Sequence, residues 1–279
     1  MGSIHEENVL KLLTNLVKER TRLFPKDEIE RSTNILETRF GGRPIGETGM
    51  KWPHCNGCGS PFKFVGQVHL SIYRHTPPFD FFAFYYCWEC GLKNRTSFFN
   101  ANEPNDAVGW KVVTYDSLKE KDASLLPLPH TFEEIDLIKE RQVTSSLEKS
   151  FPDVVGFELH APSIWRELNA LVDPKTNRVE AGYWDKINRL NKLAASLVGF
   201  KNEKNPELRN KGLNLDGYPY WCNGPDQTPQ CPECASSMEL LVQISPDSAV
   251  HANWRDGWTP YVFYCAKHKH QFSLCFQGT

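Results

Sequence analysis

The chain of 279 residues has no long hydrophobic run and no excess of either charge. Its densest apolar stretch, Phe79–Trp88, is far shorter than the roughly 18 residues needed to cross a bilayer and contains Asp80, so we interpret it as a buried strand. Lys and Arg number 32 against 34 Asp and Glu, and this balance argues against duplex DNA as the main partner, because such binding depends on neutralising phosphates. With 24% charged and 12% aromatic residues, the composition also excludes intrinsic disorder.

Known catalytic signatures are missing as well. The sequence contains no G-x-S-x-G elbow, no P-loop and no G-x-G-x-x-G fingerprint. A zinc deaminase needs H-x-E followed by P-C-x-x-C around an open zinc position. The run His5-Glu6-Glu7 fits only the first half of that pattern, and Pro229 stands one residue too early for the second. The sequence therefore does not predict an enzyme.

The beginning of the chain shows no secretory pattern, because polar residues precede the first apolar ones. Nine cysteines without an export signal indicate a reducing compartment, where paired cysteines more often hold a metal than form disulfides. We therefore expect a cytoplasmic protein with metal sites and no membrane association.

Residue patterning divides the chain into four segments. Residues 1–37 are expected to be an N-terminal helical segment, and residues 38–126 a first half rich in short strands. Residues 127–212 are expected to be a helical middle that ends in a polar linker. In residues 213–279 the glycine, proline and aromatic texture of the first half returns.

Within these segments, apolar residues at helical spacing predict a helix over about His5–Arg20, which packs on its own domain or, alternatively, on a partner. Thr131 and Glu134 have the spacing of a capping box at the start of a helix. Two further helices are expected over Ser163–Leu171 and Tyr183–Val198. Apolar and aromatic runs predict three strands, at Phe62–Leu70, Phe81–Trp88 and Trp110–Tyr115.

The last segment repeats the second one. Matching anchors recur at offsets of 175 to 178 positions: Gly42-Arg43-Pro44 with Gly217-Tyr218-Pro219; Pro53, Cys55, Cys58 and Gln67 with Pro229, Cys231, Cys234 and Gln243; and Cys87 and Cys90 with Cys265 and His268. Chance does not keep so many anchors in step, so the chain contains two copies of one structural unit.

Each copy carries four candidate metal ligands. The first set is C-x2-C, a loop of 28 residues and C-x2-C, formed by Cys55, Cys58, Cys87 and Cys90. The second is C-x2-C, a loop of 30 residues and C-x2-H, formed by Cys231, Cys234, Cys265 and His268. Two intervening residues let a tight turn aim both side chains at one ion, and four such ligands suit Zn²⁺. We expect two structural zinc ions, because neither set leaves a position open for substrate.

Alternatives remain for some of these residues. The cysteines could be buried free thiols, although that does not explain their duplicated pairing. His270 could replace His268 as the ligand, but the spacing of His268 mirrors Cys87 and Cys90. Cys222 and Cys275 are interpreted as ordinary buried thiols.

A loop between the ligand pairs of the second set is a candidate partner-binding surface. It contains Trp254, Arg255 and Trp258, and aromatic side chains anchor many interfaces. The alternative is that both tryptophans cap the core, which is the usual fate of large apolar side chains.

The segments Thr38–Pro44, Trp52-Pro53 and Phe64–Val68, together with Tyr261–Cys265 in the second copy, resemble the bacterial YwqG-like proteins, a family of unknown function. The segment from Gly217 to Cys265 also resembles programmed cell death protein 2. The resemblance implies an α+β fold in which two pseudo-symmetric, zinc-stapled β-sheet units carry helices between them and at the N-terminus.

The resemblance also guides the functional expectation. We expect a non-enzymatic zinc protein that binds and masks a partner protein, in the manner of an immunity protein (antitoxin) that neutralises its toxin. One alternative is a dedicated chaperone or assembly factor for a ribosomal or other nascent protein, the role of the eukaryotic relatives. Another is an enzyme with an unrecognised site. Nucleic-acid binding is the weakest expectation, because few cations stand near the candidate ligands.

Overall fold

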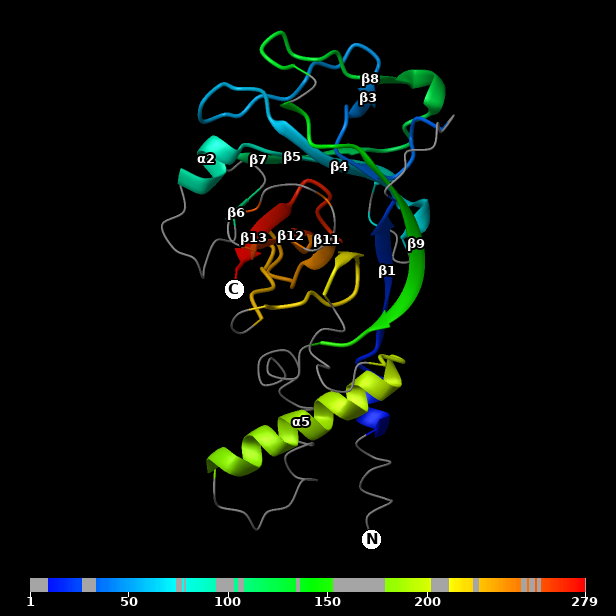
Figure 1. Ribbon diagram of the computed structural model, residues 1–279, viewed down its shortest axis with the longest axis vertical. Coiled ribbons are helices and arrows are strands. Elements are labelled where there is room, and N and C mark those ends of the chain that lie inside the picture. Colours follow the sequence, from blue (N-terminus) through cyan, green and yellow to red (C-terminus); the bar gives the residue numbers. More distant parts are fainter. Residues whose placement is uncertain are drawn as a thin grey trace. The chain divides into compact units, whose positions relative to one another are not determined.

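Strands form most of the regular structure of this chain in the computed structural model (Figure 1). The structure describes residues 10–26, 34–73, 77, 79–93, 103–104, 108–133, 136–152, 179–201, 211–222, 226–246, 250, 254 and 257–278. The chain divides into two compact units. The helical unit comprises Met1–Arg20, Leu147–Lys211 and Gly217–Asp226, and the sheet unit comprises Thr21–Ser146, Gly212–Asp216 and Gln227–Thr279.

One large sheet of 11 strands runs in the order β6-β13-β12-β11-β10-β1-β9-β2-β4-β5-β7. Its strands are β1 (Lys18–Pro25), β2 (Arg39–Phe40), β4 (Lys63–His69), β5 (Phe81–Tyr86), β6 (Glu103–Pro104), β7 (Trp110–Tyr115), β9 (Arg141–Ser150), β10 (Leu213–Leu215), β11 (Glu239–Ile244), β12 (Thr259–Tyr264) and β13 (Phe272–Gln277). A small second sheet pairs β3 (Ile45–Glu47) with β8 (Ala123–Leu125). The short helices are η1 (Leu70–Ile72), α2 (Trp88–Lys93) and η2 (Glu120–Asp122).

The internal repeat is visible in the strand order. The run β2-β4-β5-β7 comes from the first copy and the run β10-β11-β12-β13 from the second, with β1 and β9 between them. Both β4–β5 and β11–β12 are antiparallel pairs with a register shift, between Phe64 and Gly66 in the first and between Leu240 and Val242 in the second. These irregularities stand at matching places in the two copies, so the repeat extends to fine backbone detail.

The large sheet is nearly closed on itself. Its edge strands β6 and β7 are separated in sequence only by residues 105–109, which keeps the two edges near each other. β6 comes from the first copy but pairs with β13 of the second, with Pro104 opposite Ser273. The two copies therefore share one continuous sheet and are not two separate sheet units. Among the residues that the structure describes, the fold is mostly β, and helices contribute less than the α+β expectation implied.

The core of the sheet unit is built from both copies. The Phe79 ring lies 6.0 Å from that of Tyr264 and 5.8 Å from that of Phe272. The Tyr73 hydroxyl lies 2.8 Å from the carbonyl oxygen of Leu240 and 2.6 Å from that of Leu241, to which it donates. Burying one such aromatic side chain contributes about 1.5–3 kcal/mol, so this shared core is a major source of stability.

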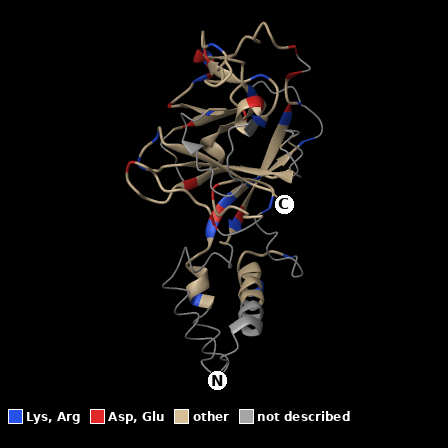
Figure 2. Cartoon of the chain, turned by 90° about the vertical axis from the view of Figure 1, so that its left-hand side faces the viewer, with Lys and Arg blue, Asp and Glu red and all other residues tan. Residues whose placement is uncertain are grey.

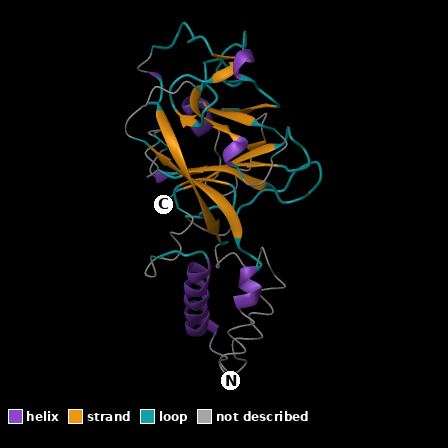
Figure 3. Ribbon diagram, turned by 90° about the vertical axis from the view of Figure 1, so that its right-hand side faces the viewer, coloured by secondary structure: helices purple, strands orange, loops and turns teal. Residues whose placement is uncertain are grey.

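The helical unit is organised around α5 (Val179–Leu197), whose long ribbon is the clearest helix in Figure 3. Apolar residues spaced three and four apart on α5 pack with a helical stretch at residues 10–14. The buried cluster consists of Leu13, Phe151, Ile187, Leu190 and Ala194. Among the described residues, no helix is both long enough and apolar enough to span a bilayer.

Two expectations for the helices are corrected. Within the middle segment, which was expected to be helical, Arg141–Ser150 instead forms the strand β9 between β1 and β2. The N-terminal helix does not reach Arg20, because β1 begins at Lys18 and pairs with β10 through Thr21 and Leu23. In both places hydrogen bonding to distant strands overrides local helical spacing.

One further expected helix is present, whereas the remaining helical expectations involve residues that the structure does not describe. The expected helix over Tyr183–Val198 is confirmed as α5. Thr131 lies in a turn, while its expected capping partner Glu134 and the expected helix over Ser163–Leu171 fall outside the described residues.

Candidate metal centres

The first ligand pair sits on a tight turn just before β4, which we call the first knuckle (residues 54–61). The Cys55 N–H donates to the carbonyl oxygen of Ser60 (2.8 Å), and the Gly59 N–H donates to that of Cys55 (2.9 Å). A β-bridge between His54 and Pro61 closes its base. Gly59 has a φ of +72°, a conformation that favours glycine and allows the chain to turn back so sharply. The knuckle thus aims the thiols of Cys55 and Cys58 the same way.

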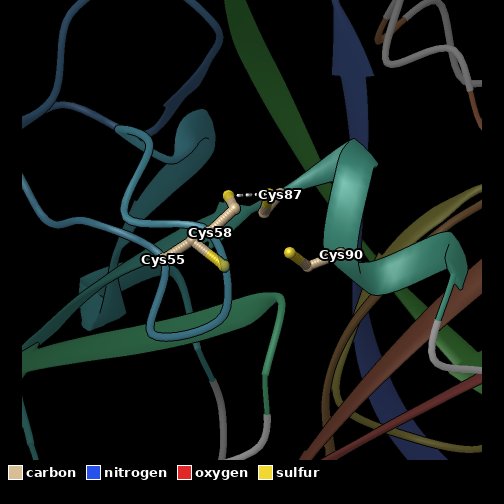
Figure 4. Close-up of side chains that lie close together, drawn as sticks. All are labelled: Cys55, Cys58, Cys87 and Cys90. Atoms are coloured by element: carbon tan, nitrogen blue, oxygen red, sulfur yellow. Dashed lines mark hydrogen bonds between the residues drawn. The ribbon is translucent and has the colours of Figure 1, made fainter.

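The second ligand pair comes from the end of β5. Cys87 follows the strand directly and Cys90 lies in α2, so the strand-to-helix turn brings them together (Figure 4). The Gly91 N–H donates to the carbonyl oxygen of Cys87 (2.8 Å), and the Cys87 N–H donates to that of Gly109 (2.7 Å). A Cβ at Gly91 would lie 2.4 Å from the Tyr86 ring, so only glycine fits beside this turn.

The second cluster repeats this construction. Its knuckle (residues 230–237) is closed by a bridge between Gln230 and Ser237 and by a hydrogen bond from the Cys231 N–H to the carbonyl oxygen of Ser236 (2.9 Å). Cys265 follows β12 as Cys87 follows β5, and His268 takes the place of Cys90.

Both clusters have the dimensions of a tetrahedral metal site. In each, the four ligand atoms lie within 4.8 Å of one another. Sulfur ligands bound at about 2.3 Å to a tetrahedral ion are about 3.8 Å apart, and a nitrogen bound at about 2.0 Å lies about 3.5 Å from each sulfur. The distance between Sγ atoms is 3.7 Å for Cys58 and Cys87 and 3.7 Å for Cys234 and Cys265. His268 Nδ1 lies 3.4 Å from Cys231 Sγ and 3.6 Å from Cys265 Sγ. Each cluster could therefore hold one metal ion.

Local hydrogen bonds favour the metal-binding form of two cysteines. The side chain and the backbone N–H of Ser60 lower the pKa of Cys58 to about 6. Ser236, at the matching place, does the same for Cys234, whose pKa is also about 6. Burial acts in the opposite direction on Cys87 and raises its pKa to about 12. A metal ion binds cysteine in its thiolate form. The positive charge of the ion would therefore have to favour deprotonation of buried ligands such as Cys87.

The geometry distinguishes the two histidines. His268 presents Nδ1 to the cluster, whereas His270 is exposed and lies with its Nε2 2.5 Å from Glu233 Oε1. The other carboxylate oxygen of Glu233 lies 3.7 Å from His268 Nε2. Hydrogen bonding to the Cys231 sulfur raises the pKa of His268. Glu233 was not singled out from the sequence, although a carboxylate between two ligand positions is a usable signal, since such groups orient ligating histidines.

The remaining predicted residues lie apart from the clusters. Cys275 is buried in β13 and Cys222 is half-buried in the helical unit. Trp254 has 6% of its surface exposed and stacks on Trp88, with ring centroids 5.1 Å apart. Of the two roles considered for Trp254, its burial among aromatic rings favours the core role over that of an exposed partner anchor.

The other two residues of that candidate surface differ from Trp254. Trp258 is half-buried against the same core, so part of its indole remains accessible. Arg255 falls outside the described residues.

Comparison with known proteins gives a family but no activity. A family model described as "Domain of unknown function (DUF1963)" matches residues 38–269, which include all eight predicted ligands. No curated protein matches the chain. The match begins at Thr38, where the likeness to the YwqG-like proteins begins, but its description names neither those proteins nor programmed cell death protein 2. Because the matched region covers most of the 279 residues, the chain belongs to the DUF1963 family, whose function is unknown.

Proposed function

We propose that each cluster holds one Zn²⁺ and that both ions are structural. Three or four sulfur ligands with at most one imidazole form the donor set typical of structural zinc. In each cluster all four tetrahedral positions are taken by protein atoms, so no position is left for a water or a substrate. The ions would join each knuckle to the end of a central strand and so fix the loops around it.

On this basis we propose that the protein is not an enzyme and acts by binding and masking a partner protein, as an immunity protein (antitoxin) neutralises its toxin. The observation that carries the proposal is the pair of closed ligand sets. They make a rigid scaffold without supplying reactive chemistry. Rigid scaffolds favour protein recognition because little ordering entropy is lost on binding. The half-buried Trp258 is a candidate contact residue, since aromatic side chains anchor interfaces.

We extend this proposal to the symmetry of the fold and to the location of the protein in the cell. We take the matching register shifts and knuckles as the trace of a duplication that relates the two copies by a pseudo-twofold axis, as in the YwqG-like likeness. We also place the protein in the cytoplasm, where nine reduced cysteines would be maintained.

The test is affinity purification of the tagged full chain from its native host, together with co-expression with the product of the neighbouring gene. A single protein retained in stoichiometric amount supports masking, and loss of that protein's toxicity on co-expression supports the immunity role. Retention of a nascent ribosomal protein instead favours the chaperone alternative, whose motive is the run from Gly217 to Trp221 shared with programmed cell death protein 2. Turnover of a metabolite by the purified chain would remove the proposal.

A further inference from the structure

A polar pocket opens beside the short strand β2, away from both metal clusters. β2 is only two residues long, whereas its neighbours β9 and β4 continue past it. On its way into β2 the chain segment 34–38 runs between them without forming a strand of its own. The space that is left has a volume of about 270 Å³. That is below the roughly 300–1,000 Å³ of pockets for drug-sized ligands, so it suits one side chain better than a nucleotide.

The lining of this pocket combines a carboxylate with several neutral oxygen atoms. It includes Glu37, Thr38 and Ser71, with Ser145 from β9 opposite, and none of its described lining residues is Lys or Arg. Glu37 Oε1 accepts a hydrogen bond from Gln142 Nε2 (3.1 Å), while its second oxygen accepts none from the residues that the structure describes. The pocket therefore offers one negatively charged acceptor that is not fully used.

The charge of Arg39 acts on Glu37 but is not directed at it alone. Arg39 is buried, its Nη2 donates to the carbonyl oxygen of Arg43 (2.6 Å), and burial lowers its pKa. Two carboxylates, Glu140 and Glu37, oppose that shift, so the charge of Arg39 is shared between them.

His69 adds a fixed imidazole at the pocket wall. Its Nδ1 accepts from the backbone N–H of Ser71 (3.2 Å) and lies 2.8 Å from the Ser71 hydroxyl. With Nδ1 acting as an acceptor, the neutral ring carries its proton on Nε2.

We propose that this pocket receives an arginine side chain presented by the partner protein. The inference rests on the masking function proposed above and names a docking point for it. A planar guanidinium has five N–H donors, so it can contact the Glu37 carboxylate and the Ser and Thr oxygens at the same time. Charge-assisted hydrogen bonds of this kind are about twice as strong as neutral ones, which gives the pocket a preference for arginine over neutral side chains.

The first experiment measures the pocket's chemistry without a partner. N-acetyl-arginine methylamide is titrated into the full chain and followed by NMR, with the citrulline analogue as the neutral control of the same shape. We expect about tenfold stronger binding of the arginine probe, and its loss in Glu37→Gln. Glu120→Gln removes the same charge from exposed η2 and should bind like the wild type. Equal binding of both probes, or unchanged binding by Glu37→Gln, overturns the proposal.

A second variant tests whether the loss of binding expected in Glu37→Gln arises at the pocket itself. Ser145→Arg places a guanidinium at the exposed rim of the pocket, on β9, and should block the probe while leaving the melting temperature unchanged. If Ser145→Arg still binds the arginine probe as the wild type does, the site is not the one described here.

The third measurement separates this proposal from the proposed function. Partner retention is compared for the wild type, Glu37→Gln, Ser145→Arg and Glu120→Gln. Loss of at least about tenfold in affinity with the first two variants alone supports arginine docking. Equal retention by all four overturns the docking proposal and leaves the masking function standing. Failure of every chain to retain a protein removes the masking function, whatever the probes show.

Discussion

At the scale of single residues, the two knuckles differ at one informative position. Gly59 and Ala235 stand at matching places, and both have positive φ, +72° and +53°. For an L residue with a Cβ, this region costs about 1–2 kcal/mol, whereas glycine adopts it freely. The second knuckle therefore contains a local strain that the first avoids.

Exchanging these two residues should shift stability in opposite directions. Gly59→Ala should lower the melting temperature by a few degrees and Ala235→Gly should raise it, each by about 1 kcal/mol or less in the free energy of unfolding. No atom lies within 4 Å of a Cβ built at Gly59, so the effect there is conformational and not steric. Calorimetry on both variants checks this. A stabilising Gly59→Ala would contradict the assigned knuckle conformation.

Glu233 provides a second prediction at this scale. Because its carboxylate lies beside His268 Nε2, Glu233→Gln should weaken metal binding at the second cluster by about tenfold or more, without affecting the first. Competition with a chromophoric chelator gives the two affinities. His268→Ala should abolish the second site, whereas His270→Gln, which removes an exposed ring, should change it much less. Loss of the site in His270→Gln would exchange the roles of the two histidines.

At the scale of elements, the sequence predicted buried strands better than exposed ones. The strands β4, β5 and β7 were predicted within a residue or two, because all three are short runs rich in aromatic and β-branched residues, and in β4 and β5 these runs are buried on both faces. β9 was predicted to be helical. Four successive residues of β9, Thr144–Leu147, are exposed and show no alternation, so only its pairing with β1 and β2 makes it a strand.

The sequence likewise indicated the metal clusters, which depend on local spacing, but not the pocket, which depends on strand pairing. All eight residues of the two clusters that could hold a metal ion were singled out from the sequence, since each pair is local in sequence and duplicated. The pocket around Glu37 and His69 was not predicted, because it depends on the register between β2, β4 and β9, which lie far apart along the chain. Trp254 could not be placed without the position of Trp88, which comes from the other copy.

The Tyr73 hydroxyl links the end of η1 to β11, and we expect its removal to lower stability. Tyr73, directly after η1, donates to the carbonyl oxygens of Leu240 and Leu241 at the irregular point of β11. Tyr73→Phe removes this buried hydrogen bond between the two elements and should cost about 1–3 kcal/mol in urea denaturation. Tyr115→Phe is the matched control, because the Tyr115 hydroxyl donates to the Met50 sulfur (3.0 Å), a weak acceptor. Equal losses in the two variants would remove the link as the cause.

At the scale of the whole molecule, the two metal clusters should behave as folding determinants. Structural zinc binding is coupled to folding, so its free energy adds to that of the native state. Chain purified without added metal should contain two zinc ions by elemental analysis. A content near zero in folded protein contradicts the proposal, and a content near one removes one of the two sites.

Cysteine variants test the same point through stability. Cys58→Ser and Cys234→Ser should each lower the melting temperature more than Cys275→Ser, because each opens a four-ligand site whereas Cys275 is an ordinary buried thiol. Thermal melts of the three variants decide this. If Cys275→Ser is the most destabilised, the ligand assignment is wrong.

The pairing of β6 with β13 has a consequence for how the chain could be divided. A cut between Lys201 and Lys211 would separate the two copies. The shorter fragment would then carry β10 to β13 but lack both strands that flank them, β1 and β6. Each fragment would expose unpaired edges that only the other can cover. Expressed together, the two pieces should reassemble, so this chain offers a natural split point for a fragment-complementation reporter.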